Sequence, residues 1–348
     1  MSVDIIVGMQ FGSEGKGKVA SVLANYYAAA VRVGAPNAGH TVVDHGQKYV
    51  MRHIPSACIN HSCRLLIGPA GMVNMEVLAK ELQSLPSDVV DRLRIDEHAM
   101  VINESHIAQE REGKMWEHIG STAEGVGAAL KEKIGRKGVK LAKDYEELKP
   151  YITDAALEVN RMLENGQRVL IEGTQGTGLS LNHSHYPFCT SRDVIASTLL
   201  GDCGIAPYYV RHVIGVMRTY PIRVAGNSGP MSAPEITWEE VQRRSGKLDP
   251  IKEITTVTKR VRRVSEISWE ELRRAVMLNR PSVMFITFLD YINGRDFKCR
   301  EASKLSKEAK MFVQEVEKQT GVPVIGASTG PDVVDTVWFS DNVDKLFE

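Results

Sequence analysis

The sequence is poor in the features that mark secreted, membrane-spanning or zinc-binding proteins. None of its five cysteines forms a Cys-x-x-Cys pair, and no apolar run approaches the roughly 20 residues that cross a bilayer. The N-terminal residues also lack the basic and then apolar pattern of a signal peptide. We therefore expect a cytoplasmic protein with no membrane partner, whose thiols stay reduced and mostly buried.

An excess of charge of one sign is also missing. Lys+Arg and Asp+Glu each total 43, so the formal net charge is zero. A chain with no net charge has no overall positive electrostatic field to attract nucleic acid or an anionic membrane, so neither is expected as a partner. Any anionic ligand must then be bound by local clusters of basic side chains.

The nearest approach to a metal-binding cluster is the pair Cys58 and Cys63, with His61 between them. Their spacing is poor for zinc, and no second pair of ligands follows in the sequence. We therefore expect no zinc site.

The most informative stretch is a glycine-rich loop that follows a strand-like run at residues 3–7. Four glycines fall within residues 8–17, and Lys16 and Lys18 alternate with them. Such glycines let the backbone turn tightly and bring its N–H groups close to a ligand. Residues 19–30 then predict a helix, whose N-terminus favours anions. The loop indicates a phosphate site, with a bare strand-to-helix turn as the plain alternative.

This loop almost matches the P-loop of nucleotide-binding proteins. Gly12, Gly17 and Lys18 have the required spacing, but Val19 stands where Ser or Thr would hold Mg²⁺. The mismatch disfavours an ordinary P-loop kinase.

Strand-like apolar runs alternate with helical patterns along the chain. Strands are expected at residues 3–7, 50–55, 168–172, 213–217, 283–289 and 323–326, and helices at 19–30, 76–85, 153–165, 269–279 and 301–320. This alternation predicts an α/β fold with a mostly parallel central sheet flanked by helices. We expect a single enlarged catalytic domain over residues 1–348, with loop-rich excursions near 104–140 and 225–265.

Further motifs lie where strands are expected to end, the usual place for ligands in such sheets. His40, flanked by Gly39 and Thr41, is suited to act as an acid or a hydrogen-bond donor, or has a structural role. Gln175 lies in a glycine-rich segment that follows a strand. Residues 259–263 carry four cations, which suit a carboxylate or phosphate clamp as well as a solvated face.

Taken together and in this order, the motifs resemble the adenylosuccinate synthetases over nearly the whole chain. The glycine-lysine loop and residues 37–41 are the most specific, and residues 173–176, 186–191 and 328–331 support them. The resemblance implies the P-loop-like fold of that family. It also implies a ligase that joins L-aspartate to C6 of a 6-oxopurine nucleotide through a 6-phosphoryl intermediate, using Mg²⁺ and a nucleoside triphosphate.

The resemblance further implies roles for individual residues. Ser13, Lys16 and His40 occupy the catalytic positions. Residues expected at the triphosphate are Gly12, Glu14, Gly15, Lys16, Gly17, Lys18, Gly39, Thr41, Asp290, Ser328, Gly330 and Pro331. Residues expected at the purine monophosphate or at aspartate are Ser13, Asn37, Ser121, Thr122, Arg136, Gln175, Thr190, Val224, Thr258, Arg260 and Arg262. Ser13 and Gly39 would be the Mg²⁺ ligands, and Arg136 would cross the interface of a homodimer.

Four departures from the family pattern matter. Ser13 replaces an aspartate that serves as the general base at purine N1 and as a Mg²⁺ ligand. Phe288 replaces a lysine two residues before Asp290, which favours ATP or dATP over GTP as the donor. Lys259 replaces a glycine in the aspartate loop, and Glu124 replaces a basic residue.

The change at Ser13 resembles a subgroup, the phage 2-aminoadenylosuccinate synthetases, which act on dGMP. This resemblance implies dGMP, L-aspartate and ATP or dATP as substrates, and the host cytoplasm as the location if the protein is phage-encoded. The alternatives are an ordinary adenylosuccinate synthetase acting on IMP with GTP and, more distantly, a non-catalytic nucleotide-binding regulator.

Overall fold

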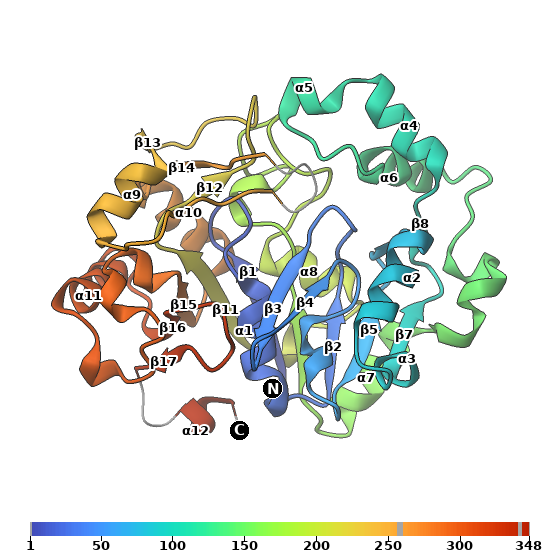
Figure 1. Cartoon of the computed structure of the whole chain (residues 1–348). Helices are drawn as coiled ribbons and strands as arrows, with labels where there is room; N and C mark the ends of the chain where they lie inside the picture. Colours follow the sequence, from blue (N-terminus) through green and yellow to red (C-terminus); the bar gives the residue numbers. More distant parts are fainter. Residues whose placement is uncertain (1, 256–259, 340–342, 348) are drawn as a thin grey trace.

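A ten-stranded sheet forms the centre of the molecule (Figure 1). The computed structural model describes residues 2–255, 260–339 and 343–347. In order across the sheet, the strands are β17 (Thr336–Trp338), β16 (Val324–Ser328), β15 (Val283–Thr287), β11 (Val210–Arg218), β1 (Val3–Gly8), β10 (Val169–Glu172), β2 (Ala29–Arg32), β5 (Arg64–Ile67), β7 (Leu93–Asp96) and β9 (Ile152–Thr153). Every neighbouring pair is parallel except β16–β17, so the expected α/β fold is confirmed.

The central strands are mostly apolar because helices cover both faces of the sheet. Every residue of β1, β10 and β15 is buried. One face is covered by α1 (Lys16–Leu23), α2 (Met75–Ser84), α3 (Val89–Arg92) and α12 (Val343–Phe347). The other face is covered by α7 (Ala155–Glu164), α8 (Ala196–Asp202), α10 (Trp269–Asn279) and α11 (Lys307–Thr320). No helix in the described part of the chain has the length and apolar character needed to cross a bilayer.

Two excursions lie above the sheet in the view of Figure 1. The first contains α4 (Glu104–Glu112), α5 (Met115–Ile119) and α6 (Val126–Gly135). The second contains the small sheet of β12 (Ile222–Arg223), β13 (Glu235–Ile236) and β14 (Arg263–Ser265), together with α9 (Trp238–Ser245). The hairpin of β3 (His40–Asp44) and β4 (Gln47–Met51) and the pair of β6 (Met72–Val73) and β8 (Met100–Val101) complete the fold.

Three expected elements differ from the structure. The helix expected over residues 19–30 ends at Leu23, and β2 (Ala29–Arg32) follows, because this short run is buried between β10 and β5. The strand expected at 50–55 is instead β4, which ends at Met51. The helix expected from residue 301 begins at Lys307, since the Ser306 side chain accepts a hydrogen bond from the Ala309 amide and caps it there.

Candidate active site

A cavity of about 630 Å³ lies between the glycine-rich loop and the two excursions. It gathers segments that are far apart in the sequence, as expected for ligands at the ends of parallel strands. The predicted residues that line it are Gly12, Ser13, Lys16, Asn37, Gly39, His40, Ser121, Thr122, Gln175, Thr190, Val224, Arg260 and Arg262. The structure thus brings most of the residues predicted for the acceptor nucleotide and aspartate to one place.

The other predicted residues lie outside the lining of this cavity. They are Glu14, Gly15, Gly17, Lys18, Thr41, Arg136, Asp290, Ser328, Gly330 and Pro331. Arg136 is exposed just after α6. Thr258 lies outside the described residues.

Glu14 organises the glycine-rich loop from within. Its buried carboxylate accepts hydrogen bonds from the amides of Gln10 at 3.2 Å and Gly12 at 2.8 Å, and pairs with Lys16 Nζ at 2.6 Å. Gly12 has a φ of 85°, a left-handed conformation that glycine adopts without strain. A Cβ on Gly17 would stand 2.7 Å from His40 Cβ, so glycine is required for this close approach. The loop therefore holds Lys16 at the cavity wall and His40 against the start of α1.

Ser13 stands on the cavity side of this loop. It is exposed, and its φ of 57° is unusual for a residue other than glycine. Its carbonyl accepts a hydrogen bond from Arg218, whereas its hydroxyl makes none within the described part of the chain. The hydroxyl is therefore available to a ligand.

His40 belongs to a buried network at the end of β10. Its Nδ1 lies 2.5 Å from a Glu172 oxygen, and the same carboxylate accepts hydrogen bonds from Ser56 and from Arg32 at 3.1 Å. Burial, followed by the nearby Arg32 charge, lowers the pKa of His40 to about 4, although Glu172 opposes this shift. At neutral pH the imidazole is thus neutral, and the contact at Nδ1 leaves Nε2 available on the cavity side.

Lys18 points away from the cavity and toward the turn at residues 328–331. Its Nζ donates to Ser328 Oγ and the Gly330 carbonyl, both at 2.8 Å, and to the Asp335 carbonyl at 2.9 Å. Burial lowers the pKa of Lys18 to about 8. The lysine thus joins the start of α1 to the region predicted for the base of the triphosphate.

A second lysine in that region was missed by the sequence analysis. Lys247 Nζ pairs with the Asp290 carboxylate and lies over the rings of Tyr291, at 4.9 Å, and Phe297, at 4.7 Å. Burial raises the pKa of Asp290, and the Lys247 partner opposes that shift. Asp290 is therefore paired with a lysine from the loop after α9, and no local sequence motif signals this contact.

Three more side chains of the site were not predicted. Glu172 ends the strand expected at residues 168–172, and the sequence assigns no role to it. Arg223 lines the cavity and stacks on Phe11, with its guanidinium carbon 4.5 Å from the ring centroid. Trp116 also lines the cavity, and the Arg260 guanidinium lies 5.1 Å from its ring. These contacts join residues that are remote in sequence, so only the fold reveals them.

Glu124, which replaces a basic residue of the family pattern, forms an ion pair with Arg52. Its carboxylate lies 2.6 Å from Arg52 Nη2, and Arg52 Nε donates to the Pro36 carbonyl. The acidic residue therefore anchors the segment that leads to Asn37 instead of adding a charge to the cavity lining.

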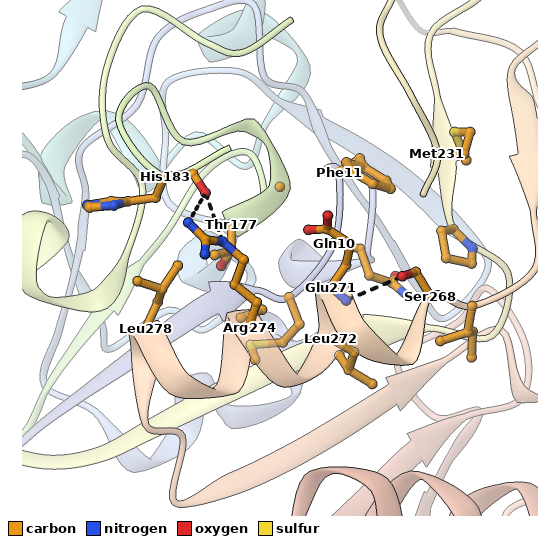
Figure 2. A pocket seen from close by; sticks show the side chains of 15 residues that line it. Gln10, Phe11, Thr177, His183, Met231, Ser268, Glu271, Leu272, Arg274 and Leu278 are labelled. Carbon is orange, nitrogen blue, oxygen red and sulfur yellow. Dashed lines mark hydrogen bonds between the residues drawn. The ribbon is translucent and has the colours of Figure 1, made fainter. Parts of the chain in front are cut away.

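A second, far smaller cavity is lined by Phe11 and by residues of α10 (Figure 2). Its volume is about 20 Å³, which leaves room for about one water molecule. Figure 2 shows Arg274 reaching the His183 carbonyl across its rim, at 3.3–3.4 Å. This cavity is too small for a substrate.

The oxygens offered to Mg²⁺ are neutral. Ser13 and Gly39 both line the large cavity, while the Glu14 carboxylate is already used by the loop. No group of three or more His, Cys, Asp or Glu side chains that could hold a metal occurs among the described residues. Because Mg²⁺ is usually held by phosphate oxygens and water together with a few protein oxygens, the residues fit it as a companion of bound phosphate.

The fold and this cavity define an α/β nucleotide-binding protein with an anion-binding loop at the end of its first strand. The family profile of adenylosuccinate synthetase matches residues 5–145 and 140–298. The adenylosuccinate synthetase of Pyrococcus horikoshii is 40% identical over 335 residues, which cover 94% of this chain and 96% of the relative. That of Archaeoglobus fulgidus is 40% identical over 337 residues, covering 96% and 97%. The chain belongs to the adenylosuccinate synthetase family.

Solved structures give the same fold. Fully ligated adenylosuccinate synthetase from Plasmodium falciparum matches with a TM-score of 0.87 at 21% identity, over 98% of this chain and 100% of that chain. Succinoaminodeoxyadenylate synthetase (PurZ) of cyanophage S-2L, bound to dGMP and to dATP as an energy donor, matches with a TM-score of 0.82 at 28% identity. The latter match covers 99% of this chain and 98% of that chain.

Proposed function

We propose that this C–N ligase joins L-aspartate to C6 of dGMP and uses ATP or dATP as the phosphoryl donor. The products would be N6-succino-2-amino-2′-deoxyadenylate, phosphate and the nucleoside diphosphate. The observation that carries the proposal is Ser13, which lines the cavity with a hydroxyl that has no partner within the described chain. We also propose that residues 1–348 act as one catalytic domain.

The proposed reaction has two steps. The γ-phosphoryl group moves to the purine 6-oxygen, and the aspartate amine then attacks C6 and displaces phosphate. The second step needs the first because an unmodified 6-oxygen is a poor leaving group. Positioning and electrostatic stabilisation are the main contributions a protein makes to such phosphoryl transfer. Mg²⁺, when bound, would neutralise charge on the phosphates.

Ser13 favours guanine as the acceptor base. Guanine differs from hypoxanthine by an amino group at C2, next to N1. The short serine leaves room for that amino group, and its hydroxyl can accept a hydrogen bond from the amino group or from N1–H. A pocket that pairs such a polar group discriminates strongly against a base that lacks it. Serine is too weak a base to take the N1 proton, and we assign that proton to no residue.

Lys16 and His40 would act on the transferring group. Lys16 is held at the cavity wall by Glu14, which places its ammonium beside the loop amides. Because the pKa of His40 is low in the folded chain, the arrival of phosphate charge would favour its protonation. A protonated His40 could then stabilise the purine 6-oxygen through Nε2.

Arg260 and Arg262 would hold the aspartate carboxylates. Both line the cavity, and neither guanidinium makes an ion pair within the described residues. Uncompensated arginines in a cavity wall favour an anionic ligand. We further propose that Thr258 belongs to the same loop, that Asp290 and residues 328–331 hold the donor base, and that Arg136 enters the site of a partner chain in a homodimer.

The second candidate is an ordinary adenylosuccinate synthetase acting on IMP with GTP. The archaeal relatives, which are adenylosuccinate synthetases at 40% identity, favour this reading over the dGMP reaction. The cyanophage protein, which binds dGMP and dATP in its solved structure, supports the dGMP reading at lower identity. Ser13 therefore decides our preference between the two.

The test is a substrate panel. The purified protein is incubated with aspartate and one of dGMP, GMP, dIMP or IMP, each with ATP, dATP or GTP, and the product is identified by mass. We expect turnover of dGMP. Efficient formation of adenylosuccinate from IMP, with no use of dGMP, would establish the second candidate. A complete absence of product in every combination would favour a non-catalytic regulator.

A further inference from the structure

Arg218 ends the central strand β11 and is fully buried. On one side of β11 lies β1, which leads into the Ser13 loop, and on the other lies β15, which leads to Phe288. Its position therefore places a guanidinium between the acceptor cavity and the region of the donor base.

The Arg218 side chain contacts three separate segments. Nη1 donates to the Ser13 carbonyl at 3.2 Å and to the Glu253 carboxylate at 3.1 Å, and Nη2 donates to the other Glu253 oxygen. The guanidinium carbon lies 4.1 Å from the centroid of the Phe288 ring. A buried arginine paired through both nitrogens is held in one orientation.

Glu253 lies between two arginines. Its carboxylate is engaged by Arg218, and its carbonyl accepts a hydrogen bond from the Arg262 amide at 2.9 Å. The Arg262 guanidinium is in the cavity wall and makes no ion pair in the described part of the chain. Burial lowers the pKa of Arg262, while the Glu253 charge opposes that shift, so the carboxylate is close enough to act on it.

We propose that Arg218 is a positioning residue that occupies the Glu253 carboxylate and so leaves Arg262 free to bind a carboxylate of aspartate. This inference rests on the proposed aspartate-binding role of Arg262. Glu253 is only 20% exposed, and although the Tyr291 hydroxyl also faces it, a carboxylate that loses its cationic partner there is costly to leave uncompensated. Without Arg218, the Glu253 carboxylate turns to Arg262 and competes with the substrate.

The proposal makes a rescue experiment possible. In Arg218→Met, Glu253 captures Arg262, and the KM for aspartate rises about tenfold or more, as is usual when a charged hydrogen bond is lost, with a smaller change in kcat. The double variant Arg218→Met/Glu253→Gln lacks the competing charge, and its KM returns to within about threefold of wild type. A purely structural Arg218 would instead leave the double variant as impaired as the single one.

Arg262→Met serves as the reference variant, and its KM for aspartate should rise at least as much as that of Arg218→Met. All variants are measured with whichever acceptor nucleotide the wild type uses, and their unfolding is compared by circular dichroism. Should Arg218→Met fail to fold, Arg218→Lys replaces it, with an expected KM increase of about threefold or more that Glu253→Gln again reverses.

Two results would overturn the inference separately. An unchanged KM for aspartate in Arg262→Met removes the proposed role of Arg262 and, with it, the role of Arg218. A raised KM in Arg262→Met, combined with either no effect of the Arg218 variant or no rescue by Glu253→Gln, overturns the role of Arg218 alone.

Discussion

At the scale of single residues, His40 offers the sharpest test of the catalytic assignment. His40→Asn keeps a polar side chain of similar size beside Glu172 but removes the group that can be protonated. We expect turnover to fall by about 100-fold or more, the usual contribution of a general acid or an electrostatic stabiliser. Steady-state kinetics with the productive substrate pair provides the measurement. A near wild-type rate would show that the site has been assigned wrongly.

His40 should also shape the dependence of stability on pH. Its pKa is about 4 in the folded chain and 6.5 when unperturbed, so between these values the unfolded chain binds more protons. The free energy of unfolding therefore falls as the pH is lowered from about 6.5 to about 4. His53, whose pKa burial also lowers, contributes in the same direction.

Urea unfolding at several pH values in this window tests the prediction. His40→Asn should show a shallower loss of stability with falling pH than wild type, and a residual slope should remain from His53. An identical slope in both proteins would contradict the lowered pKa of His40.

Ser13 is the residue on which acceptor choice is proposed to depend. In Ser13→Asp, the longer carboxylate takes the space offered to the guanine amino group. We expect kcat/KM for dGMP to fall about tenfold or more, in keeping with the loss of a paired polar group, while some use of IMP appears. Ser13→Ala is the matched control, because it removes the hydroxyl without adding bulk or charge. Retention of full dGMP activity by Ser13→Asp would refute the proposal.

At the scale of elements, Lys247 bears on the choice of donor. Its ammonium engages Asp290, whose carboxylate would otherwise accept hydrogen bonds from the N1–H and amino group of a guanine. We therefore expect ATP or dATP to serve at least as well as GTP in the wild-type protein. Lys247→Met should free the carboxylate and move the ratio of kcat/KM values toward GTP by about tenfold, the worth of one or two charged hydrogen bonds.

Lys298→Met is the matched control for this test, since Lys298 lies over the same Phe297 ring. It should leave the donor ratio unchanged. A strong preference of the wild-type protein for GTP, or a donor ratio that does not move in Lys247→Met, would contradict the argument.

The elements that could be predicted are those whose sequence pattern matches their environment. The helix α10 was predicted with its exact bounds because its apolar residues recur at helical spacing and Ser268 caps it. The prediction that the first helix continues to residue 30 was wrong, because the local sequence does not show that residues 29–32 are buried between two strands. Cavity residues that belong to local motifs could be predicted in the same way as α10. Lys247, Arg218 and Arg223 could not, because their partners are remote in the chain.

At the scale of the whole molecule, Arg136 is proposed to complete the site of a partner chain. It is exposed at the end of α6 and does not line the cavity of its own chain. Arg136→Leu and Lys16→Gln chains should each have little activity, but a mixture of them should recover part of it, since one of the two sites in a heterodimer would be intact. Mixing followed by an activity assay, with sedimentation to measure mass, tests this. A strictly monomeric mass at assay concentration would contradict it.

The edge strands of the central sheet limit how two copies of the chain can associate. One margin is β17, with three residues, and the other is β9, with two. Strands this short offer few unpaired backbone groups, so a second chain has almost no ladder to extend. Association through the edges of the central sheet is therefore disfavoured, and side chains of helices and loops are the expected contacts, which can be changed one at a time without disturbing that sheet. If the proposed homodimer forms, a variant made monomeric by such changes should therefore keep its fold even where it loses the proposed shared site.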